Sequence, residues 1–407
     1  MLKQGTRVLI TGGAGFIGSH VARALSAAGC HVRVLDDLSS GKRERLNGMG
    51  TRLELLQADV RNPTAVERAS KGANVLIHLA AIPVGTDAAR AQEVNLGGAL
   101  NVLNAAKAAE RHERPHVVLC GSGSVYGKQT AFVLHEELAP RPSVPQAVMA
   151  LAAEQYGRVY REAYGVPVTN LRIFRTFGPE EDAERADASV VAKFVRAALD
   201  GTSPVIQGDG QQTRDLIYID NVLGAILAAC EIDHAEPLNV ASGEAVAINF
   251  LWNLVLEMAG KKRLAIEPTY VPAPPWEPKH ARPQIQRSCK ALGWAPSVRL
   301  RDGLQRTVQH YLQQRNVDPN AWFTPKDDGR SATAPRRPSS PPMSPPSPRS
   351  TRNTPPPIPL AARRSDSRAT TPTPQPIFTK PVEETRIDDD LNFEWAPVPA
   401  VPGMGGR

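Results

Sequence analysis

Apolar runs and helical stretches alternate along the first three quarters of the chain. The apolar runs are rich in Val, Ile and Leu, as strands buried on both faces of a parallel sheet are. These runs cover residues 7–13, 31–37, 52–59, 75–81, 116–124 and 168–174. Residues 18–29 and 96–112, which lie between them, carry apolar positions at helical spacing. The alternation predicts an α/β fold with a doubly wound parallel sheet.

The pattern becomes mixed after residue 178 and changes in kind after residue 324. We expect residues 179–324 to form mainly a smaller mixed α/β substrate subdomain, with some segments returning to the first domain at 1–178. Nineteen of the 37 prolines fall in residues 325–407, among Ser, Thr and Arg. Such a composition buries too little apolar surface to offset its ordering entropy, so the sequence predicts a disordered tail.

One segment of the tail, residues 384–399 (ETRIDDDLNFEWAPVP), differs from the rest because apolar side chains interrupt an acidic run. Exposed aromatic residues such as Phe393 and Trp395 in an acidic tail are typical of a docking peptide for a protein partner. A plain unstructured end is the alternative interpretation.

The net charge of +7 does not indicate a nucleic-acid-binding protein. Residues 325–382 carry ten Lys or Arg against three Asp or Glu, so the surplus lies in the predicted tail. The chain shows no aromatic-rich basic patch or recognition motif, and we expect no nucleic-acid partner.

The four cysteines lie far apart without a C-x-x-C pair. This spacing favours reduced thiols in a cytoplasmic protein, with neither a disulfide framework nor a metal site. The chain enters a predicted strand at once and has no run of about 18 apolar residues. We therefore expect no signal peptide and no membrane span.

The stretch TGGAGFIG places Gly12, Gly15 and Gly18 between a predicted strand and a predicted helix. This spacing is typical of a Rossmann-type dinucleotide site, in which glycines allow a tight turn and close approach of the backbone to a pyrophosphate. Asp36 closes the second strand, where a carboxylate accepts hydrogen bonds from the adenosine ribose. Because that carboxylate also repels a 2′-phosphate, the sequence favours NAD over NADP.

Further motifs occur in an order that matches one enzyme family. They are ADV at 58–60, HLAA at 78–81, Asn95 in VNLGG, GSGSVYG at 121–127 and GDGQQTRDLIYIDN at 208–221. Over roughly residues 5–313 the chain resembles the extended short-chain dehydrogenase/reductase family, specifically its nucleotide-sugar epimerase/dehydratase branch. The resemblance implies NAD as cofactor and a nucleotide sugar as ligand. The cofactor-binding residues it implies are Gly12, Gly15, Phe16, Ile17, Gly18, Asp36, Asp37, Asp59, Val60, Leu79, Ala80, Ala81 and Asn95.

The family's chemistry needs a tyrosine and a lysine four residues apart on one helix, with a serine on the neighbouring strand. The lysine lowers the pKa of the tyrosine, whose phenolate then acts as a general base. Ser122 occupies the serine position, but the flanking RPSVP and LAAEQY place Gln146 at the tyrosine position and Ala150 at the lysine position. Neither replacement is an acid or base, so we expect a pseudoenzyme that acts as a binding or regulatory module.

The substrate half also departs from the family pattern. Arg175 stands where the family has a substrate-contacting asparagine, whereas Arg214 matches the family's diphosphate-binding residue. Pro274 stands where a second diphosphate-binding arginine is usual, and Gln284 where an aspartate is usual. We expect Arg175 and Arg214 to bind substrate. The motif GSGSVYG lacks the Asp-Glu pair of sugar dehydratases, which argues against dehydration.

Two other hypotheses stay open. An active NAD-dependent epimerase could use acid/base residues elsewhere, namely His135, Glu136, Glu137 or Tyr126. The alternative interpretation is a solvated loop for the His-Glu-Glu run and a structural role for Tyr126. The third hypothesis is a scaffold that binds no nucleotide, because the missing lysine also removes a contact to the nicotinamide ribose. The resemblance further implies a homodimer, paired through helices at about 97–112 and 146–164.

Overall fold

Seven parallel strands form the central sheet, in the order β12-β7-β5-β4-β1-β2-β3. The strands are β1 (Arg7–Thr11), β2 (His31–Asp36), β3 (Leu53–Gln57), β4 (Val75–His78), β5 (His116–Ser122), β7 (Val168–Ile173) and β12 (Leu238–Val240). All six strands expected from the apolar runs are present, each ending a few residues earlier than predicted. The prediction of a doubly wound, Rossmann-type sheet is confirmed.

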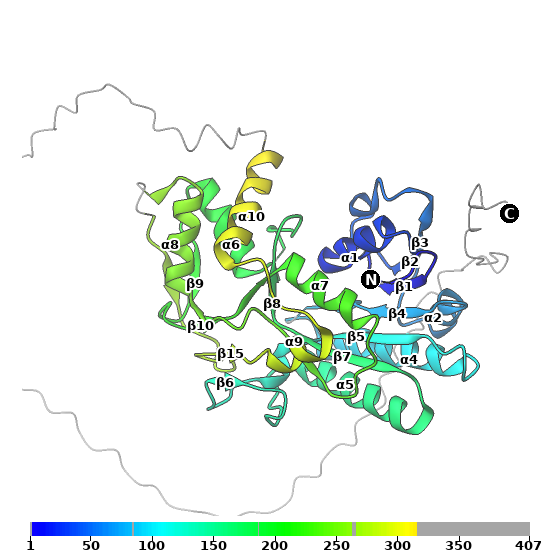
Figure 1. Cartoon of the computed structure of the whole chain (residues 1–407). Coiled ribbons are helices and arrows are strands. Elements are labelled where there is room, and N and C mark those ends of the chain that lie inside the picture. The colour runs from blue at the N-terminus through cyan, green and yellow to red at the C-terminus, as the bar shows by residue number, and fades with distance from the viewer. Residues whose placement is uncertain (1, 84, 186, 263–265, 316–407) are drawn as a thin grey trace, which may run out of the picture. The chain divides into compact units, whose positions relative to one another are not determined.

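The structure describes residues 2–83, 85–185, 187–262 and 266–315 (Figure 1). The predictions for the tail, including its disorder and its docking segment at 384–399, lie outside the described residues. The boundary between a first domain at 1–178 and a subdomain at 179–324 also stays a prediction, although β12 at 238–240 belongs to the central sheet.

Helices cover both faces of the sheet because adjacent strand residues point to opposite sides. In β1, Val8 and Ile10 join one apolar cluster and Leu9 joins another. Figure 1 shows α1 and α7 on one side of the sheet and α4 and α5 on the other. The first cluster contains residues of α1 (Phe16–Ala27), α7 (Ile219–Ala229) and α9 (Gln286–Leu292), and the second contains residues of α2 (Pro63–Ser70), α4 (Gly98–Ala108) and α5 (Pro145–Tyr164).

A third apolar cluster lies among α6 (Val190–Asp200), α8 (Ile248–Met258) and α10 (Leu300–Gln314). Phe194 and Trp252 meet edge to face in it, with ring centroids 5.3 Å apart. Four pairs of short strands complete the described part of the fold, and they include Arg175 and Arg214, the residues expected to bind substrate. The pairs are β8 (Arg175–Phe177) with β11 (Leu216–Tyr218), β9 (Val205–Gln207) with β14 (Thr269–Val271), β10 (Thr213–Arg214) with β13 (Val246–Ala247), and β6 (Val133–Leu134) with β15 (Arg282–Pro283).

Helix α5 carries Gln146 and Ala150, the residues that the sequence analysis expects at the catalytic positions. Pro145 opens the helix, where its missing N–H has no partner to lose, and Gly165 ends it in the left-handed conformation with φ 68°. A buried ion pair joins the helix to β7, since Arg172 donates to both carboxylate oxygens of Glu154 at 2.7 and 2.8 Å. The helix therefore cannot rotate or slide without breaking this pair.

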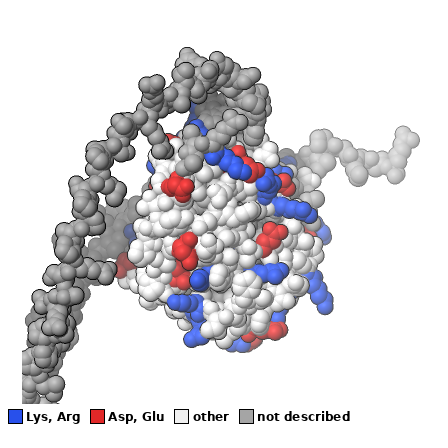
Figure 2. Space-filling view, turned by 90° about the vertical axis from the view of Figure 1, so that its left-hand side faces the viewer, with Lys and Arg blue, Asp and Glu red and all other residues white. Residues whose placement is uncertain are grey.

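On the face shown in Figure 2, acidic and basic side chains are interspersed around a largely uncharged middle. Nucleic-acid-binding domains instead gather their Lys and Arg into one patch or stripe. Among the described helices, none is both long and apolar enough to cross a membrane.

Candidate cofactor and substrate sites

A cavity of about 380 Å³ opens at the carboxyl ends of β1, β2, β3 and β4. This is the edge at which doubly wound sheets bind nucleotides. Twelve of the thirteen residues expected to hold the cofactor line it. They are Gly12, Gly15, Phe16, Ile17, Gly18, Asp36, Asp37, Asp59, Val60, Leu79, Ala80 and Ala81.

The glycine loop fits a dinucleotide because its three glycines meet different needs. Gly12 has φ 73°, and a Cβ there would lie 2.6 Å from the Ala80 nitrogen. A Cβ on Gly18 would overlap the Gly12 carbonyl oxygen. Gly12 therefore lets the end of β1 approach the segment after β4, and Gly18 lets α1 approach the turn at Gly12. A Cβ on Gly15 would have only that same oxygen nearby, at 3.2 Å. Since Gly15 lines the cavity at the start of α1, its bare backbone leaves room for a pyrophosphate.

Two neighbouring carboxylates end β2, and they are not equivalent. Asp36 is buried, and its two oxygens accept the Ala14 and Leu38 N–H groups, both at 2.9 Å. Burial raises the pKa of Asp36, and these N–H groups oppose the rise. Asp37 is exposed and accepts the N–H and hydroxyl of Ser39 at 2.9 and 2.7 Å. Asp36 thus shapes the loop as well as lining the cavity, and Asp37 adds a second carboxylate to the cavity wall.

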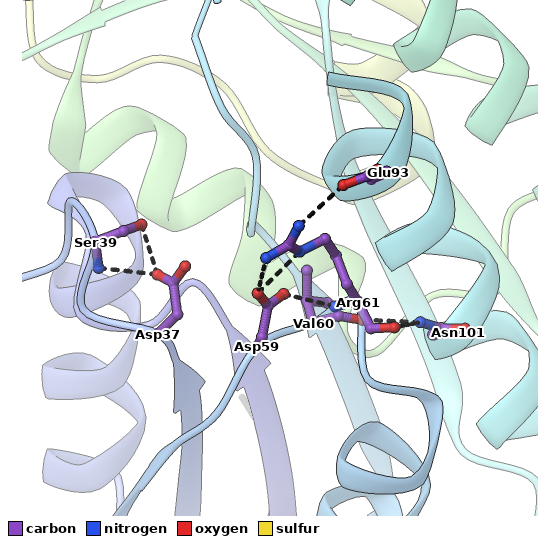
Figure 3. A network of polar contacts seen from close by, with 7 residues as sticks. All are labelled: Asp37, Ser39, Asp59, Val60, Arg61, Glu93 and Asn101. Carbon is purple, nitrogen blue, oxygen red and sulfur yellow. Dashed lines mark hydrogen bonds and ion pairs between the residues drawn. The ribbon is translucent and has the colours of Figure 1, made fainter. Parts of the chain in front are cut away.

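Arg61 completes the next part of the wall, and the sequence analysis missed it (Figure 3). Its guanidinium binds Asp59 at 2.7 and 2.9 Å and reaches Glu93 at 2.9 Å. Its side-chain hydrogen bonds to Asp59 lower the carboxylate's pKa, against the effect of burial. Asn101 donates to the Val60 and Arg61 carbonyl oxygens at 2.9 and 3.1 Å. The only sequence signal was the position of Arg61 directly after the expected Asp59-Val60 pair.

Another part of the cavity wall lies far along the chain from the glycine loop and consists of Glu181, Asp182, Arg185, Asp187 and Ala188. Asp182 pairs with Lys42 at 2.7 Å, and Arg185 binds Asp187 at 2.8 and 3.0 Å. Arg45 donates to the Glu180 carbonyl oxygen at 2.7 Å from the opposite side. The sequence analysis missed this wall as well, and its acidic run EEDAERAD was the available signal.

Asn95 is the expected cofactor residue that does not line the cavity. It lies in the π-helix η3 (Gln92–Gly97), and its amide pairs with both backbone groups of Ile82 at 2.8 and 3.2 Å. Asn95 therefore holds the segment after β4 in place. Ile82 itself lines the cavity, so Asn95 shapes the wall through its neighbour.

The three residues expected at the family's catalytic positions do not line this cavity. Ser122 ends β5, and its hydroxyl accepts the Ser124 N–H at 3.1 Å. Gln146 is buried, and its amide donates to the Thr86 carbonyl oxygen at 3.0 Å. Ala150 packs against a small apolar cluster that includes Tyr126. Gln146 and Ala150 thus serve packing and loop attachment.

Tyr126 and Glu136, two of the alternative acid/base residues, belong to a buried polar network. The Tyr126 hydroxyl donates to the Asn239 amide oxygen at 2.8 Å and accepts from Arg172 at 2.9 Å. Burial raises the pKa of Tyr126, with Arg172 opposing the rise. Glu136 is buried and accepts the Asn239 N–H at 3.1 Å, so the expected solvated loop is wrong at this residue. Glu137 is exposed and pairs with Arg287 at 2.7 Å.

The expected substrate residues come together on short strands. Arg175 of β8 and Arg214 of β10 both donate to Glu277, at 2.9 and 2.5 Å. Arg214 is buried, and the side chain of Arg175 is half exposed. Phe177 is buried in the core beside Tyr218, with ring centroids 5.6 Å apart.

A family model described as the NAD dependent epimerase/dehydratase family matches residues 8–241. The chain belongs to this family. The resemblance drawn from the motifs is thereby confirmed, and NAD is the cofactor in the family's description. A putative UDP-glucose 4-epimerase of Methanocaldococcus jannaschii is 30% identical over 316 residues, which cover 76% of this chain and 99% of that protein.

Solved structures of family members share the fold. UDP-glucose 4-epimerase of Thermotoga maritima with UDP-glucose has a TM-score of 0.71 and 30% identity, covering 76% of this chain and all of that one. UDP-glucuronic acid 4-epimerase of Bacillus cereus, in complex with UDP-glucuronic acid and NAD, has a TM-score of 0.69 and 27% identity. This match also covers 76% of this chain and all of that one.

Proposed function

We propose that this family member binds NAD and a nucleotide sugar but is catalytically impaired, and that it acts as a binding or regulatory module. The Gln146 side chain carries the proposal, because it stands at the general-base position and its amide is engaged by the Thr86 carbonyl oxygen. A carboxamide neither takes up nor releases a proton in the useful range. Ala150 supplies no charge to tune a base and no donor for the nicotinamide ribose.

The expected rate loss follows from these two positions. NAD, when bound, accepts and returns a hydride at a sugar carbon. A base must remove the sugar hydroxyl proton at the same time, and loss of a positioned base costs about 10²–10⁴-fold in rate. Ser122 alone cannot replace it, because a serine hydroxyl is a weak base. Binding, in contrast, depends on the glycine loop and the carboxylates, which are present.

A proton NMR time course tests the proposal. Full-length protein at stoichiometric concentration is mixed with NAD and with UDP- and dTDP-sugars, including UDP-glucose and UDP-glucuronic acid. We expect saturation-transfer signals from bound NAD and unchanged sugar spectra over hours. New sugar signals that disappear in a Ser122→Ala variant would identify an active enzyme instead, and a folded protein without NAD contacts would identify a scaffold.

We also propose that the chain forms a homodimer through α4 and α5. Val148, Tyr156 and Val159 support this, because they share one side of α5 and are each more than 40% exposed. Light scattering after size exclusion should give twice the chain mass, and Val159→Glu should give a monomer. The control is Val205→Glu, at an exposed valine on β9. A dimer that survives Val159→Glu rules out this interface.

We further propose that residues 384–399 recruit a protein partner. The acidic and aromatic character of the segment supports this. Capture experiments with the full chain and with a chain lacking 384–399 test it, using Phe393→Ala with Trp395→Ala as the smaller change. Identical sets of captured proteins would argue against the proposal.

A further inference from the structure

Two arginine side chains from different strands converge on a single carboxylate oxygen. Arg175 reaches Glu277 Oε1 with Nη2 at 2.9 Å. Arg214 reaches the same oxygen with Nη2 at 2.5 Å and with Nε at 3.1 Å. The cluster carries two positive charges and one negative charge. Since one oxygen serves both guanidinium groups, they lie close enough together to bind two oxygens of one larger anion.

The side chains of the two arginines differ in exposure and in the hydrogen bonds that hold them. The Arg214 side chain is 7% exposed, and its Nη1 donates to the Thr213 and Lys279 carbonyl oxygens at 2.8 and 3.4 Å. The Arg175 side chain is 53% exposed, and among the described residues its guanidinium donates to Glu277 alone. Arg214 is therefore a fixed element of the cluster. Arg175 can redirect its remaining N–H groups toward a ligand.

The position of Glu277 allows its carboxylate to move away from the two arginines. It lies between β14 and β15 in a turn in which its N–H donates to the Pro274 carbonyl oxygen at 3.1 Å. Lys128 holds the same turn through the Pro275 carbonyl oxygen at 3.3 Å. The Glu277 side chain is 24% exposed, so rotation about its own bonds takes the carboxylate to solvent without moving the backbone.

We propose that Arg175 replaces the arginine absent at Pro274, and that Arg175 with Arg214 binds the diphosphate of a nucleotide sugar after displacing the Glu277 carboxylate. The inference rests on the proposed function for its ligand class. Glu277 is a resident counter-anion that offsets one of the two positive charges when the ligand is absent. It sets the affinity because each diphosphate must compete with it.

Arg175→Asn tests the first half of the inference by calorimetry on the full chain. The probe is UDP, with UMP as the ligand that lacks the second phosphate. We expect UDP binding to weaken at least tenfold, and the preference for UDP over UMP to shrink. The matched control is Arg301→Asn, which removes a surface arginine paired with Glu257 at 3.0 Å and should leave UDP binding unchanged. Unchanged UDP binding in Arg175→Asn overturns the relocated arginine.

Glu277→Gln tests the second half. The amide keeps the shape and one acceptor oxygen for Arg214 but removes the competing charge. We expect UDP and inorganic pyrophosphate to bind about tenfold more tightly, because the cluster then carries two unopposed positive charges. Glu257→Gln is the control and should change neither affinity. Weaker UDP binding in Glu277→Gln would mean that Glu277 orients the arginines rather than competing with the ligand.

Titrating NAD into the same proteins separates this inference from the proposed function. NAD binding without any UDP binding, in the native chain and in Glu277→Gln alike, overturns the inference and leaves NAD binding intact. UDP binding that follows the expected order in a protein that does not bind NAD supports the arginine cluster and overturns the proposed function.

Discussion

At the level of single residues, different glycines of the loop serve folding and cofactor binding. Gly12 allows close approach of the segment after β4, and Gly18 allows close approach of the helix to the turn, because a Cβ on either would strike backbone atoms. Gly15 faces the cavity and adopts an ordinary extended conformation, with φ −72° and ψ −179°. A methyl group there would have only the Gly12 carbonyl oxygen nearby, at 3.2 Å, and would fill space in which we expect the pyrophosphate.

Gly15→Ala should therefore weaken NAD binding at least tenfold and keep the thermal midpoint within a few degrees of the native value. Calorimetry and thermal unfolding measure the two quantities. The control is Gly97→Ala, where the nearest atom to a new Cβ is the Gln92 carbonyl oxygen at 3.7 Å, outside the cavity. Native-like NAD affinity in Gly15→Ala would place the pyrophosphate elsewhere.

The sequence located some of the residues that line the cavity and missed others, and the difference has a physical reason. The glycines and Asp36 follow one another locally, so motif spacing locates them. Arg61 bridges to Glu93 on a later helix, and Asp182 meets Lys42 across the cavity. Such pairs depend on how distant segments pack, and no local spacing encodes that. The same is true of Glu277 and its two arginines.

At the level of elements, the long strands could be predicted and the short ones could not. Strands buried on both faces appear in the sequence as continuous apolar runs, and the structure contains all six strands predicted from such runs. Strands β8, β10 and β13 have two or three residues each, too few for a period of two to show. The helix α5 was expected from its sequence, but its attachment to β7 by the Glu154–Arg172 pair was not.

Breaking that pair should destabilise the fold strongly. Glu154→Ala leaves the Arg172 charge buried, with side-chain exposure of 4%, and should lower the free energy of unfolding by about 3–5 kcal/mol. Urea denaturation measures the loss. Glu137→Ala breaks the exposed pair with Arg287 and should cost less than about 1 kcal/mol. Equal effects of the two substitutions would contradict the role assigned to the buried pair.

Strand β4 ends in a histidine that makes stability depend on pH. His78 is buried and shares a hydrogen bond of 2.8 Å with the Thr11 hydroxyl, and burial lowers its pKa to about 4. The unfolded chain takes up this proton near pH 6.5, whereas the folded chain does so only near pH 4. As the pH falls from 6.5 to 4, the titration of His78 should therefore lower the free energy of unfolding by about 3 kcal/mol.

His78→Asn removes the titrating group and should flatten the decline between pH 6.5 and pH 4. Urea denaturation at a series of pH values compares the slopes. His112→Asn is the control, because His112 is 79% exposed. A slope in His78→Asn that equals the native one would show that other groups govern acid unfolding.

For the whole molecule, the apolar core clusters of the described residues pack helices on both faces of the central sheet and join α6, α8 and α10 to one another. A chain that ends at Arg315 should therefore fold, bind NAD as the full chain does, and keep its thermal midpoint within a few degrees. A much lower midpoint would show that residues 316–407 stabilise the fold. Composition alone predicts a division near residue 325, because proline-rich segments bury little apolar surface, and the truncated chain tests that prediction.

The place of β12 in the sheet has a consequence for biosynthesis. Residues 238–240 pair with β7, whose own residues end at Ile173, so the segment 174–237 must emerge before that edge is covered. At roughly 5–20 residues per second, translation of this segment takes several seconds. During that time the β7 edge has unpaired N–H and C=O groups and can pair with another nascent chain. Growth conditions that slow elongation lengthen this interval, and we expect the fraction of newly made chain that aggregates to rise with it.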